Sequence, residues 1–234
     1  MFKIITFIDN AISLAACTAI GGALTFSAVT TATEVAATTT VKSVTTNNAD
    51  IKQSLKALLA KVEYFSADFE QKVFDEESNL LQQTSGKIKV SKPDLVYWHT
   101  DEPNESLIVS DGHTLWFYDP FIEQASAYSV NQSVANTPIL LLSNNNDELW
   151  QHYHVVKNKE NHYLIHAKDE NSKVKTLALY FTNDVNKQLR AFDIIDATGQ
   201  TSKISLKNVD ATTLINKQTF TFELPAGADL DDQR

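Results

Sequence analysis

Apolar side chains just after position 50 recur with the period of a helix. Asp50 precedes a series of apolar residues spaced three or four positions apart: Ile51, Leu55, Leu58, Leu59 and Val62. This spacing places the side chains on one face of an α-helix, and Asp is a residue type that caps helix N-termini well. The pattern predicts an amphipathic helix that is capped by Asp50 and packs one side against a core.

At Phe65 the period changes to two. Apolar and polar residues alternate over Phe65–Val73, as in a half-buried strand, and short segments of this kind continue along the chain. Turn residues separate the segments, and Asp111-Gly112 is the clearest hairpin turn. The further strands are expected near residues 85–90, 95–100, 106–110, 114–118, 124–128, 152–157, 162–167, 176–182, 189–196, 201–208 and 219–223.

The middle of the chain departs from the strand pattern. Within Gln132–Asn145, Thr137 precedes Pro138 and the apolar run Ile139–Leu142. Thr can cap a helix and Pro is favoured at the first helical position, so a short helix is predicted there, with another helical turn at Asp147–Gln151. The order of helix, strands, short helices and strands predicts a mainly β (α+β) fold, an antiparallel sheet with segregated helices.

Two of the expected strands are apolar on both faces. Leu95–Trp98 and Leu115–Tyr118 do not alternate cleanly with polar residues. One face of an antiparallel sheet usually meets water, so these strands indicate that both faces are covered or that one face lines a cavity. An ordinary two-layer core is the simpler interpretation. In the alternative interpretation, one sheet face lines a cavity, and the first helix and Leu140–Leu142 cover that cavity.

The N-terminal segment, residues 1–37, has the features of a cleaved signal peptide. Lys3 stands near its start, Ala11–Val29 carries no charge, and Val35–Ala37 provides small residues for cleavage. A retained membrane anchor is an alternative, because the uncharged run is long enough to span a bilayer. Lipidation at Cys17, which follows a Leu-Ala-Ala sequence, is a second alternative.

Residues 38–49 are rich in Thr and Asn and are expected to form a flexible leader to a single domain, residues 50–234. The formal net charge of −9 argues against nucleic acid and against anionic lipid surfaces as partners, because both are bound through Lys and Arg. After signal cleavage no cysteine is left, so we expect no disulfide or thiolate site. The polar residues 229–234 are expected to be exposed.

Patterns typical of catalysis or metal binding are weak in this chain. It contains no nucleophile elbow, phosphate loop or dinucleotide fingerprint. His152 and His154 would share one face of a strand, but a zinc site needs at least a third ligand. His99 could act as a general base in a hydrolase, although no nucleophile stands beside it in the sequence. We expect no enzymatic activity, no cofactor and no metal site.

Longer blocks of sequence occur in a characteristic order over Asp50–Arg234. They are Phe65–Lys72, Lys92-Pro93 with Trp98-His99, Ser110–Gly112, Leu115–Phe121 with Glu123-Gln124, Asn136–Pro138 and Asp231–Arg234. In these blocks the chain resembles the outer-membrane lipoprotein carrier family, LolA, whose members are periplasmic chaperones. The number and order of the blocks make the resemblance specific.

The resemblance implies an incomplete antiparallel β-barrel with a helical lid over a hydrophobic cavity. It implies that the ligands are the acyl chains of lipoproteins, and that the protein works in the periplasm as a chaperone. Two partners are implied, an inner-membrane ABC-type lipoprotein-releasing complex and an outer-membrane lipoprotein receptor. We expect a monomer. A related half-barrel that binds a different apolar ligand or has a regulatory role is the alternative.

The resemblance also leads to predictions for the cavity and its lid. The residues expected to pack inward from the lid, and to move when acyl chains enter, are Leu55, Leu59, Val62, Leu141 and Leu142. The residues expected in the cavity wall are Phe69, Val96, Trp98 and Phe117.

One position is expected to hold the lid closed. Family members carry an Arg before the Pro that matches Pro93, and its side chain is thought to bond backbone carbonyls of the lid. Lys92 stands at that position here. Lys has three donors on a flexible stem where Arg has a planar fork of five, so we expect a lid latch with fewer bonds. An exposed surface lysine is the alternative. Val96 stands where the family favours Phe.

Overall fold

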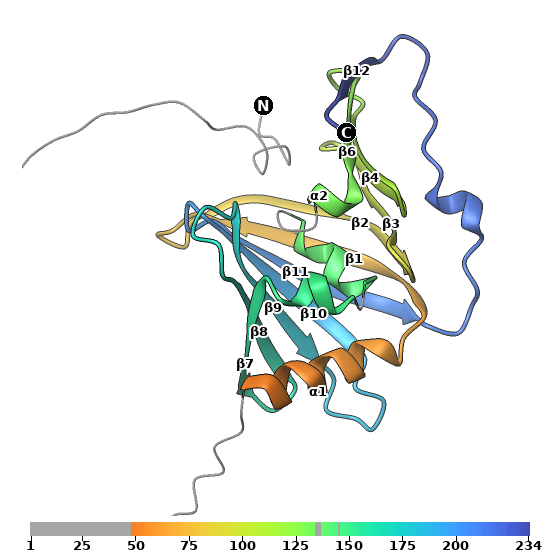
Figure 1. Cartoon of the computed structure of the whole chain (residues 1–234). Coiled ribbons are helices and arrows are strands. Elements are labelled where there is room, and N and C mark those ends of the chain that lie inside the picture. Colours follow the sequence, from red (N-terminus) through yellow and green to blue (C-terminus); the bar gives the residue numbers. More distant parts are fainter. Residues whose placement is uncertain (1–47, 134–136, 145) are drawn as a thin grey trace, which may run out of the picture.

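The computed structural model describes residues 48–133, 137–144 and 146–234. In these ranges the chain forms a curved β-sheet with short helices beside it (Figure 1). The helices are α1 (Asn48–Ala60), α2 (Val130–Ser133), η3 (Pro138–Leu142), α3 (Asp147–Trp150) and η4 (Lys217–Phe220). The strands are β1 (Tyr64–Phe74), β2 (Leu80–Ser91), β3 (Leu95–Thr100), β4 (Ser106–Asp111), β5 (Thr114–Asp119), β6 (Gln124–Ser129), β7 (Tyr153–Lys159), β8 (His162–Ala167), β9 (Val174–Phe181), β10 (Leu189–Asp196), β11 (Thr201–Asp210) and β12 (Asp229–Asp232).

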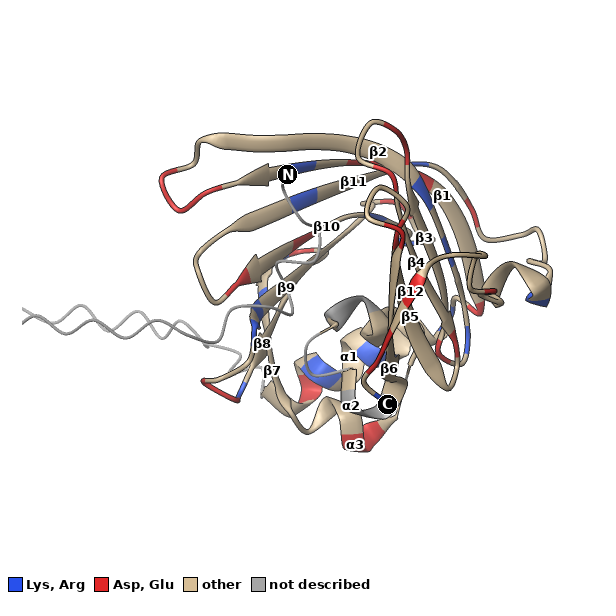
Figure 2. Cartoon of the chain, turned by 90° about the horizontal axis from the view of Figure 1, so that it is seen from above, with Lys and Arg blue, Asp and Glu red and all other residues tan. Residues whose placement is uncertain are grey.

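The sheet is open. Its described strands follow the order β12-β6-β5-β4-β3-β2-β1-β11-β10-β9-β8-β7. Neighbours run antiparallel except for β12, which pairs with β6 in parallel. β1 and β11 are far apart in the sequence but pair near the centre of the sheet, where Phe69 stands opposite Leu206. Figure 2 shows the sheet curving into a half-barrel whose two edges do not meet. The expected incomplete antiparallel barrel is confirmed.

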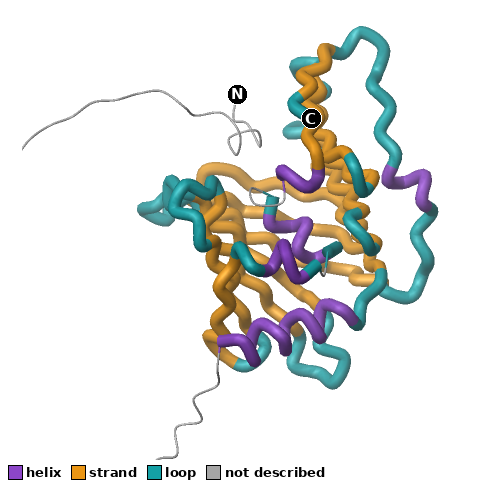
Figure 3. The backbone as a smooth tube through the Cα atoms, in the orientation of Figure 1, coloured by secondary structure: helices purple, strands orange, loops and turns teal. Residues whose placement is uncertain are grey.

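The concave side of the half-barrel is covered by helices. α1, α2, η3 and α3 lie inside the curve of the sheet (Figures 1 and 3), and α1 contacts β7 at one edge. We call α1 and η3 the covering helices. The buried face of α1 includes Leu55, Leu58 and Leu59, which recur with helical spacing. The helical pattern in this part of the sequence therefore predicts the buried face correctly.

The bounds of α1 differ from the prediction. The helix begins at Asn48, so Asp50 lies in its first turn and is not the cap that the sequence predicted. An acidic residue in the first turn still interacts favourably with the helix dipole. Val62 lies beyond the last helical residue, Ala60. Asn48 and Ala49, placed in the leader by the sequence, belong to α1.

The middle of the chain contains the predicted short helices, with one difference in capping. Pro138 stands at the start of η3, but Thr137 makes no side-chain capping bond. The expected turn after it is α3, and the Asn146 side chain caps that helix by accepting a hydrogen bond from the Glu148 backbone N–H.

The C-terminal prediction is wrong at 219–223, where a strand is expected and the structure has η4 and then irregular chain. The polar tail is mostly exposed, as expected, but it contains β12, a strand that the sequence did not predict. β12 pairs with β6 through its backbone, with Asp229 opposite Gln124. Backbone pairing of this kind leaves no apolar pattern in the sequence.

The predicted signal peptide, Cys17 and leader residues 38–47 lie outside the described residues. Among the residues that are described, no helix is long and apolar enough to cross a membrane.

Candidate functional site

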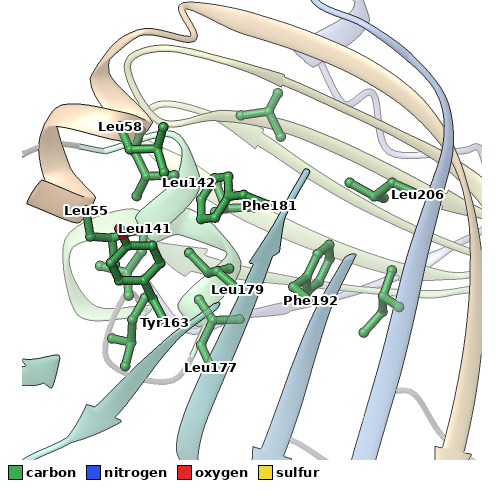
Figure 4. Close-up of a cluster of buried hydrophobic side chains, with 14 of the residues drawn as sticks. Leu55, Leu58, Leu141, Leu142, Tyr163, Leu177, Leu179, Phe181, Phe192 and Leu206 are labelled. Carbon is green, nitrogen blue, oxygen red and sulfur yellow. The ribbon is translucent and has the colours of Figure 1, made fainter. Parts of the chain in front are cut away.

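Buried apolar side chains fill the space between the covering helices and the sheet, and we call them the main cluster. Its members from the helices are Leu55, Leu58, Leu59, Leu141, Leu142 and Trp150. Its members from the sheet include Phe69, Ile88, Trp98, Tyr163, Leu177, Leu179, Phe181, Phe192 and Leu206. Figure 4 shows side chains from β8–β11 meeting those of α1 and η3. The cluster joins the concave face of the sheet to the helices that cover it.

Most of the residues predicted for the cavity and lid are brought together in the main cluster. They are Leu55, Leu59, Phe69, Trp98, Leu141 and Leu142, with Val62 packed against the edge of the cluster. Phe69 and Trp98 touch with ring centroids 4.4 Å apart. Trp98 meets Phe192 edge-on, with centroids 6.0 Å apart. Aromatic residues from β1 and β3 therefore pack together in the main cluster, and their role as a cavity wall stays a prediction.

Val96 and Phe117, the other two predicted wall residues, lie in a separate second cluster. Its buried members are Val96, Leu115, Val130 and Leu140, and Phe117 packs against them. Val96 and Trp98 point to the same side of β3 but are two positions apart, so they reach different partners. The partly buried side chains of Ile108 and Leu149 contact both clusters.

The sequence analysis missed a group of large side chains in the main cluster. Tyr163, Leu177, Leu179, Phe181 and Phe192 come from β8, β9 and β10 and are all buried. The alternation of Leu177, Leu179 and Phe181 within the predicted strand 176–182 is the signal that could have identified them.

Lys92, directly after β2, bonds the C-terminal end of α1. Its Nζ donates to the Leu59 carbonyl at 2.5 Å, and its backbone N–H donates to the Glu63 carbonyl at 2.9 Å. The last carbonyls of a helix lack helical partners, and the helix dipole favours a cation beside them. Burial lowers the pKa of Lys92, and the Glu63 charge opposes that shift. The contact has the form expected of a lid latch, and its role stays a prediction.

The same turn also contacts the other covering helix. The Asp94 backbone N–H donates to the Ser143 carbonyl at 3.2 Å, and the Asn144 side-chain amide donates to Asp94 Oδ1 at 2.7 Å. Burial raises the pKa of Asp94, while the Asn144 hydrogen bond lowers it. Thus Lys92 and Asp94, two residues apart, contact the ends of both α1 and η3.

Two lysines of α1 have contacts that the sequence analysis did not predict. Lys52 Nζ donates to the carbonyls of Trp150 and Tyr153, each at 2.8 Å. One turn later Lys56, which is only 6% exposed, forms an ion pair with Asp147 at the start of α3. The two lysines share a helix face by their spacing, but their partners lie 91–101 residues away in the sequence. Lys52 therefore attaches the N-terminal half of α1 to α3 and β7, while Lys92 bonds its C-terminal end.

Gly86 in β2 provides the space that Phe69 occupies. In the β1–β2 ladder Gly86 stands opposite Phe69. A Cβ atom built on Gly86 would lie 1.9 Å from the His99 carbonyl oxygen and 2.8 Å from the Phe69 ring. Any larger residue would push the ring or the neighbouring strand β3 out of place.

The sequence of this chain can now be compared with those of known proteins. Residues 60–223 match the model of the protein family described as outer membrane lipoprotein carrier protein LolA. The outer-membrane lipoprotein carrier protein of Aeromonas salmonicida is 38% identical over 186 residues, which are 80% of this chain and 91% of that protein. The protein of the same name from Idiomarina loihiensis is 38% identical over 78% of this chain and 88% of its own length.

The chain belongs to the LolA family of outer-membrane lipoprotein carrier proteins. The resemblance noted in the sequence blocks is confirmed. Among solved structures, a LolA superfamily protein from Nitrosomonas europaea aligns with a TM-score of 0.46 and 13% identity, over 74% of this chain and 98% of that chain. A putative outer membrane lipoprotein-sorting protein domain from Vibrio parahaemolyticus aligns with a TM-score of 0.47 and 13% identity, over 74% and 97%.

The histidines that the sequence analysis considered for catalysis or metal binding in this LolA-family chain are His99, His152 and His154, and each is at least partly exposed. His152 is exposed and His154 is half-buried at the start of β7. His99 contacts two carboxylates, with Nε2 3.2 Å from Glu105 Oε1 and Nδ1 3.7 Å from Asp101 Oδ1. Among the described residues, no group of three or more His, Cys, Asp or Glu side chains is placed to hold a metal ion.

Proposed function

We propose that the protein is a periplasmic chaperone that accepts lipoproteins released from the inner membrane, shields their acyl chains and delivers them to the outer membrane. The observation that carries this proposal is the main cluster, an apolar layer on the concave face that is covered by α1 and η3. Membership of the carrier family and the names of the relatives support the choice of cargo. The acyl chains would take the place of α1 and of the inward-facing side chains of η3 against the sheet.

The energies of loading and closure are of similar size. Burial of acyl carbon contributes about 0.8 kcal/mol per CH₂, so one long chain gains on the order of 10 kcal/mol. To enter, the chain must displace Leu55, Leu59, Leu141 and Leu142, each of which loses about 1.5–3 kcal/mol of burial. The empty state with packed helices therefore competes closely with the loaded state, which allows the cargo to be released.

The polar contacts of the covering helices would adjust that balance. A hydrogen bond from a charged donor contributes roughly 1.5–3 kcal/mol when it is partly buried. The bond from Lys92 to the Leu59 carbonyl is made with the helices packed. It would favour the empty state, and so favour release of the cargo, by about that amount.

We propose two partners for this cycle, an inner-membrane ABC-type lipoprotein-releasing complex that loads the protein and an outer-membrane lipoprotein receptor that unloads it. The signal-peptide features of residues 1–37 support a periplasmic location between these two partners. The protein would act as a monomer and need no cofactor or catalytic step.

Release of a lipoprotein from inner-membrane vesicles by the purified protein tests the proposal. The expected result is a complex of the protein with the lipoprotein in the vesicle-free fraction. Leu55→Glu, which places a charge in the main cluster, should abolish that complex. Leu214→Glu is the matched control, because Leu214 is 77% exposed and the complex should form normally.

Circular dichroism separates lost binding from lost folding. If Leu55→Glu does not fold, Val62→Glu at the partly buried edge of the cluster replaces it. Failure of the wild-type protein to release any lipoprotein would contradict the proposal, as would equal losses in Leu55→Glu and Leu214→Glu. Native mass spectrometry that finds a different apolar ligand in the purified protein would favour the alternative of a related half-barrel.

A further inference from the structure

A pocket on α1 carries positive charge that the carrier function does not use. It has a volume of about 460 Å³ and lies between α1, α3, the start of β7 and the chain after β8. Its charged lining consists of Lys52 and Lys56 from α1, Lys168 after β8, and Asp147 from α3. Trp150 and Tyr153 line the pocket as well, and both also belong to the main cluster. The pocket therefore lies beside the apolar layer, at the point where α1 meets β7.

The charges in this pocket are unbalanced. Among the described residues that line it, Asp147 is the one carboxylate, and it is paired with Lys56. Two further ammonium groups, Lys52 and Lys168, stand against no lining carboxylate of their own. Burial lowers the pKa of Lys52, and the positive charges of Lys168 and Lys56 lower it further. The three ammonium groups are therefore close enough to repel one another. This concentration of cations contrasts with the net charge of −9 of the whole chain.

The lysines also have hydrogen-bond donors left for a ligand. An ammonium group has three donors, and Lys52 gives two of them to the Trp150 and Tyr153 carbonyls. Lys168 is exposed, and its side chain has no ion-pair partner among the described residues. Lysine binds phosphate as a point charge, and a phosphate group offers up to two negative charges and several acceptor oxygens. A carboxylate would balance only one of the two ammonium groups.

We propose that this pocket binds a phosphate-class anion, the chemistry shared by inorganic phosphate and the headgroups of phospholipids. The anion lies between Lys52, Lys56 and Lys168 and accepts hydrogen bonds from Lys52 and Lys168. Its negative charge reduces the repulsion among the three lysines, so it stabilises the packing of α1 against β7. This site goes beyond lipoprotein carriage and stands or falls separately from it.

A phosphate titration followed by amide NMR tests the site. Sodium phosphate is added at low ionic strength, with sodium chloride of equal ionic strength as the reference. The expected result is a saturable shift of the amides of Gln53, Lys56, Val155 and Lys168, together with slower hydrogen exchange in α1. Lys168→Gln should weaken phosphate binding roughly threefold, as expected for loss of one exposed ion pair. Lys168→Arg should restore it.

The matched control is Lys159→Gln, which removes an exposed lysine at the far end of β7, outside the pocket. It should leave the phosphate affinity unchanged. The absence of a saturable shift in the wild-type protein, or equal weakening by Lys168→Gln and Lys159→Gln, would overturn the proposal.

Vesicles of phosphatidylglycerol distinguish the two sources of phosphate. If they perturb the same amides in a Lys168-dependent way, the ligand is a lipid headgroup. If inorganic phosphate binds and the vesicles do not, the ligand is a soluble phosphate, and the site is supported in either case.

Discussion

Leu140 and Leu141 are neighbours in η3 and are both fully buried, yet they pack into different hydrophobic clusters. Leu141 belongs to the main cluster, and Leu140 belongs to the second cluster with Val96 and Leu115. The main cluster includes the buried face of α1, whereas no residue of α1 belongs to the second cluster. Displacement of α1 would therefore open the main cluster and leave the second cluster packed.

This difference assigns separate roles to the two clusters. The main cluster is where acyl chains would replace α1 and push aside the Leu141 and Leu142 side chains of η3. The second cluster holds η3 to β3, β5 and α2, whatever position α1 takes. Substitutions in the two clusters should therefore have similar effects on stability and different effects on lipoprotein binding.

The largest expected effect comes from truncating the two leucines. Leu141→Ala and Leu140→Ala should each lower the free energy of unfolding by about 3 kcal/mol, because each removes a fully buried side chain. Urea denaturation measures both losses. Lipoprotein release from vesicles should then change in Leu141→Ala, whose cavity belongs to the acyl site, and stay normal in Leu140→Ala. Equal changes in release by the two variants would contradict the assignment of separate roles to the two clusters.

Gly86→Ala should disturb the packing of the main cluster against the sheet. The added Cβ would meet the His99 carbonyl and the Phe69 ring, so the ring or strand β3 must shift. Overpacking of this kind costs about 2 kcal/mol. Thermal denaturation should give a lower Tm, and near-ultraviolet circular dichroism should report a changed environment of Trp98. A Tm equal to that of the wild type would contradict the tight contact.

Lys92→Leu tests the latch on the main-cluster side. Loss of the bond to the Leu59 carbonyl removes the bias toward the empty state, so the loaded complex should form and persist. Transfer to the outer-membrane receptor should fall roughly tenfold, equivalent to about 1.4 kcal/mol. Lys61→Leu is the control, since Lys61 is an exposed lysine just beyond α1. Normal delivery by Lys92→Leu in a reconstituted transfer assay would refute the latch.

Asp94→Asn should have the smallest effect. Burial raises the pKa of Asp94 above the ordinary value of 3.8, so the folded state holds the proton more tightly than the unfolded state. The contribution of Asp94 to wild-type stability should therefore rise as the pH falls through its folded-state pKa. Asn tolerates the positive φ of 59° and keeps an oxygen for Asn144. The variant should be slightly more stable at neutral pH, by a margin that narrows as the pH falls through the folded-state pKa of Asp94. Urea denaturation at several pH values would exclude this account if the margin stayed constant.

Periodicity predicted most of the fold because most elements here bury one face. Periodicity failed where backbone pairing or the packing of single aromatic rings determines the structure. β12 is polar and, as the last strand at one edge of the sheet, pairs through its backbone with β6. Residues 219–223 alternate like a strand, but Phe222 covers Trp116 and Tyr118, with ring centroids at 5.0 Å and 5.8 Å. There the side chains pack while the backbone does not pair.

The candidate site was predictable residue by residue but not as a whole. Helical spacing identifies Leu55 as inward-facing, and alternation over Phe65–Val73 does the same for Phe69. Trp98 was expected in the wall from the family resemblance, because its strand does not alternate cleanly. The division of Val96 and Trp98 between two clusters depends on which helix covers each, and a one-dimensional pattern does not contain that information. The partners of Lys52 are distant in the sequence for the same reason.

The most direct test of the central claim is methyl NMR of the protein with and without a bound lipoprotein, with leucine methyl groups labelled. Acyl chains that displace α1 and enter between it and the sheet should shift the methyl signals of Leu55, Leu59 and Leu141, which lie in the main cluster. The signals of Leu115 and Leu140 in the second cluster should change little. Shifts at Leu115 and Leu140 with unchanged Leu55 and Leu141 would contradict the account.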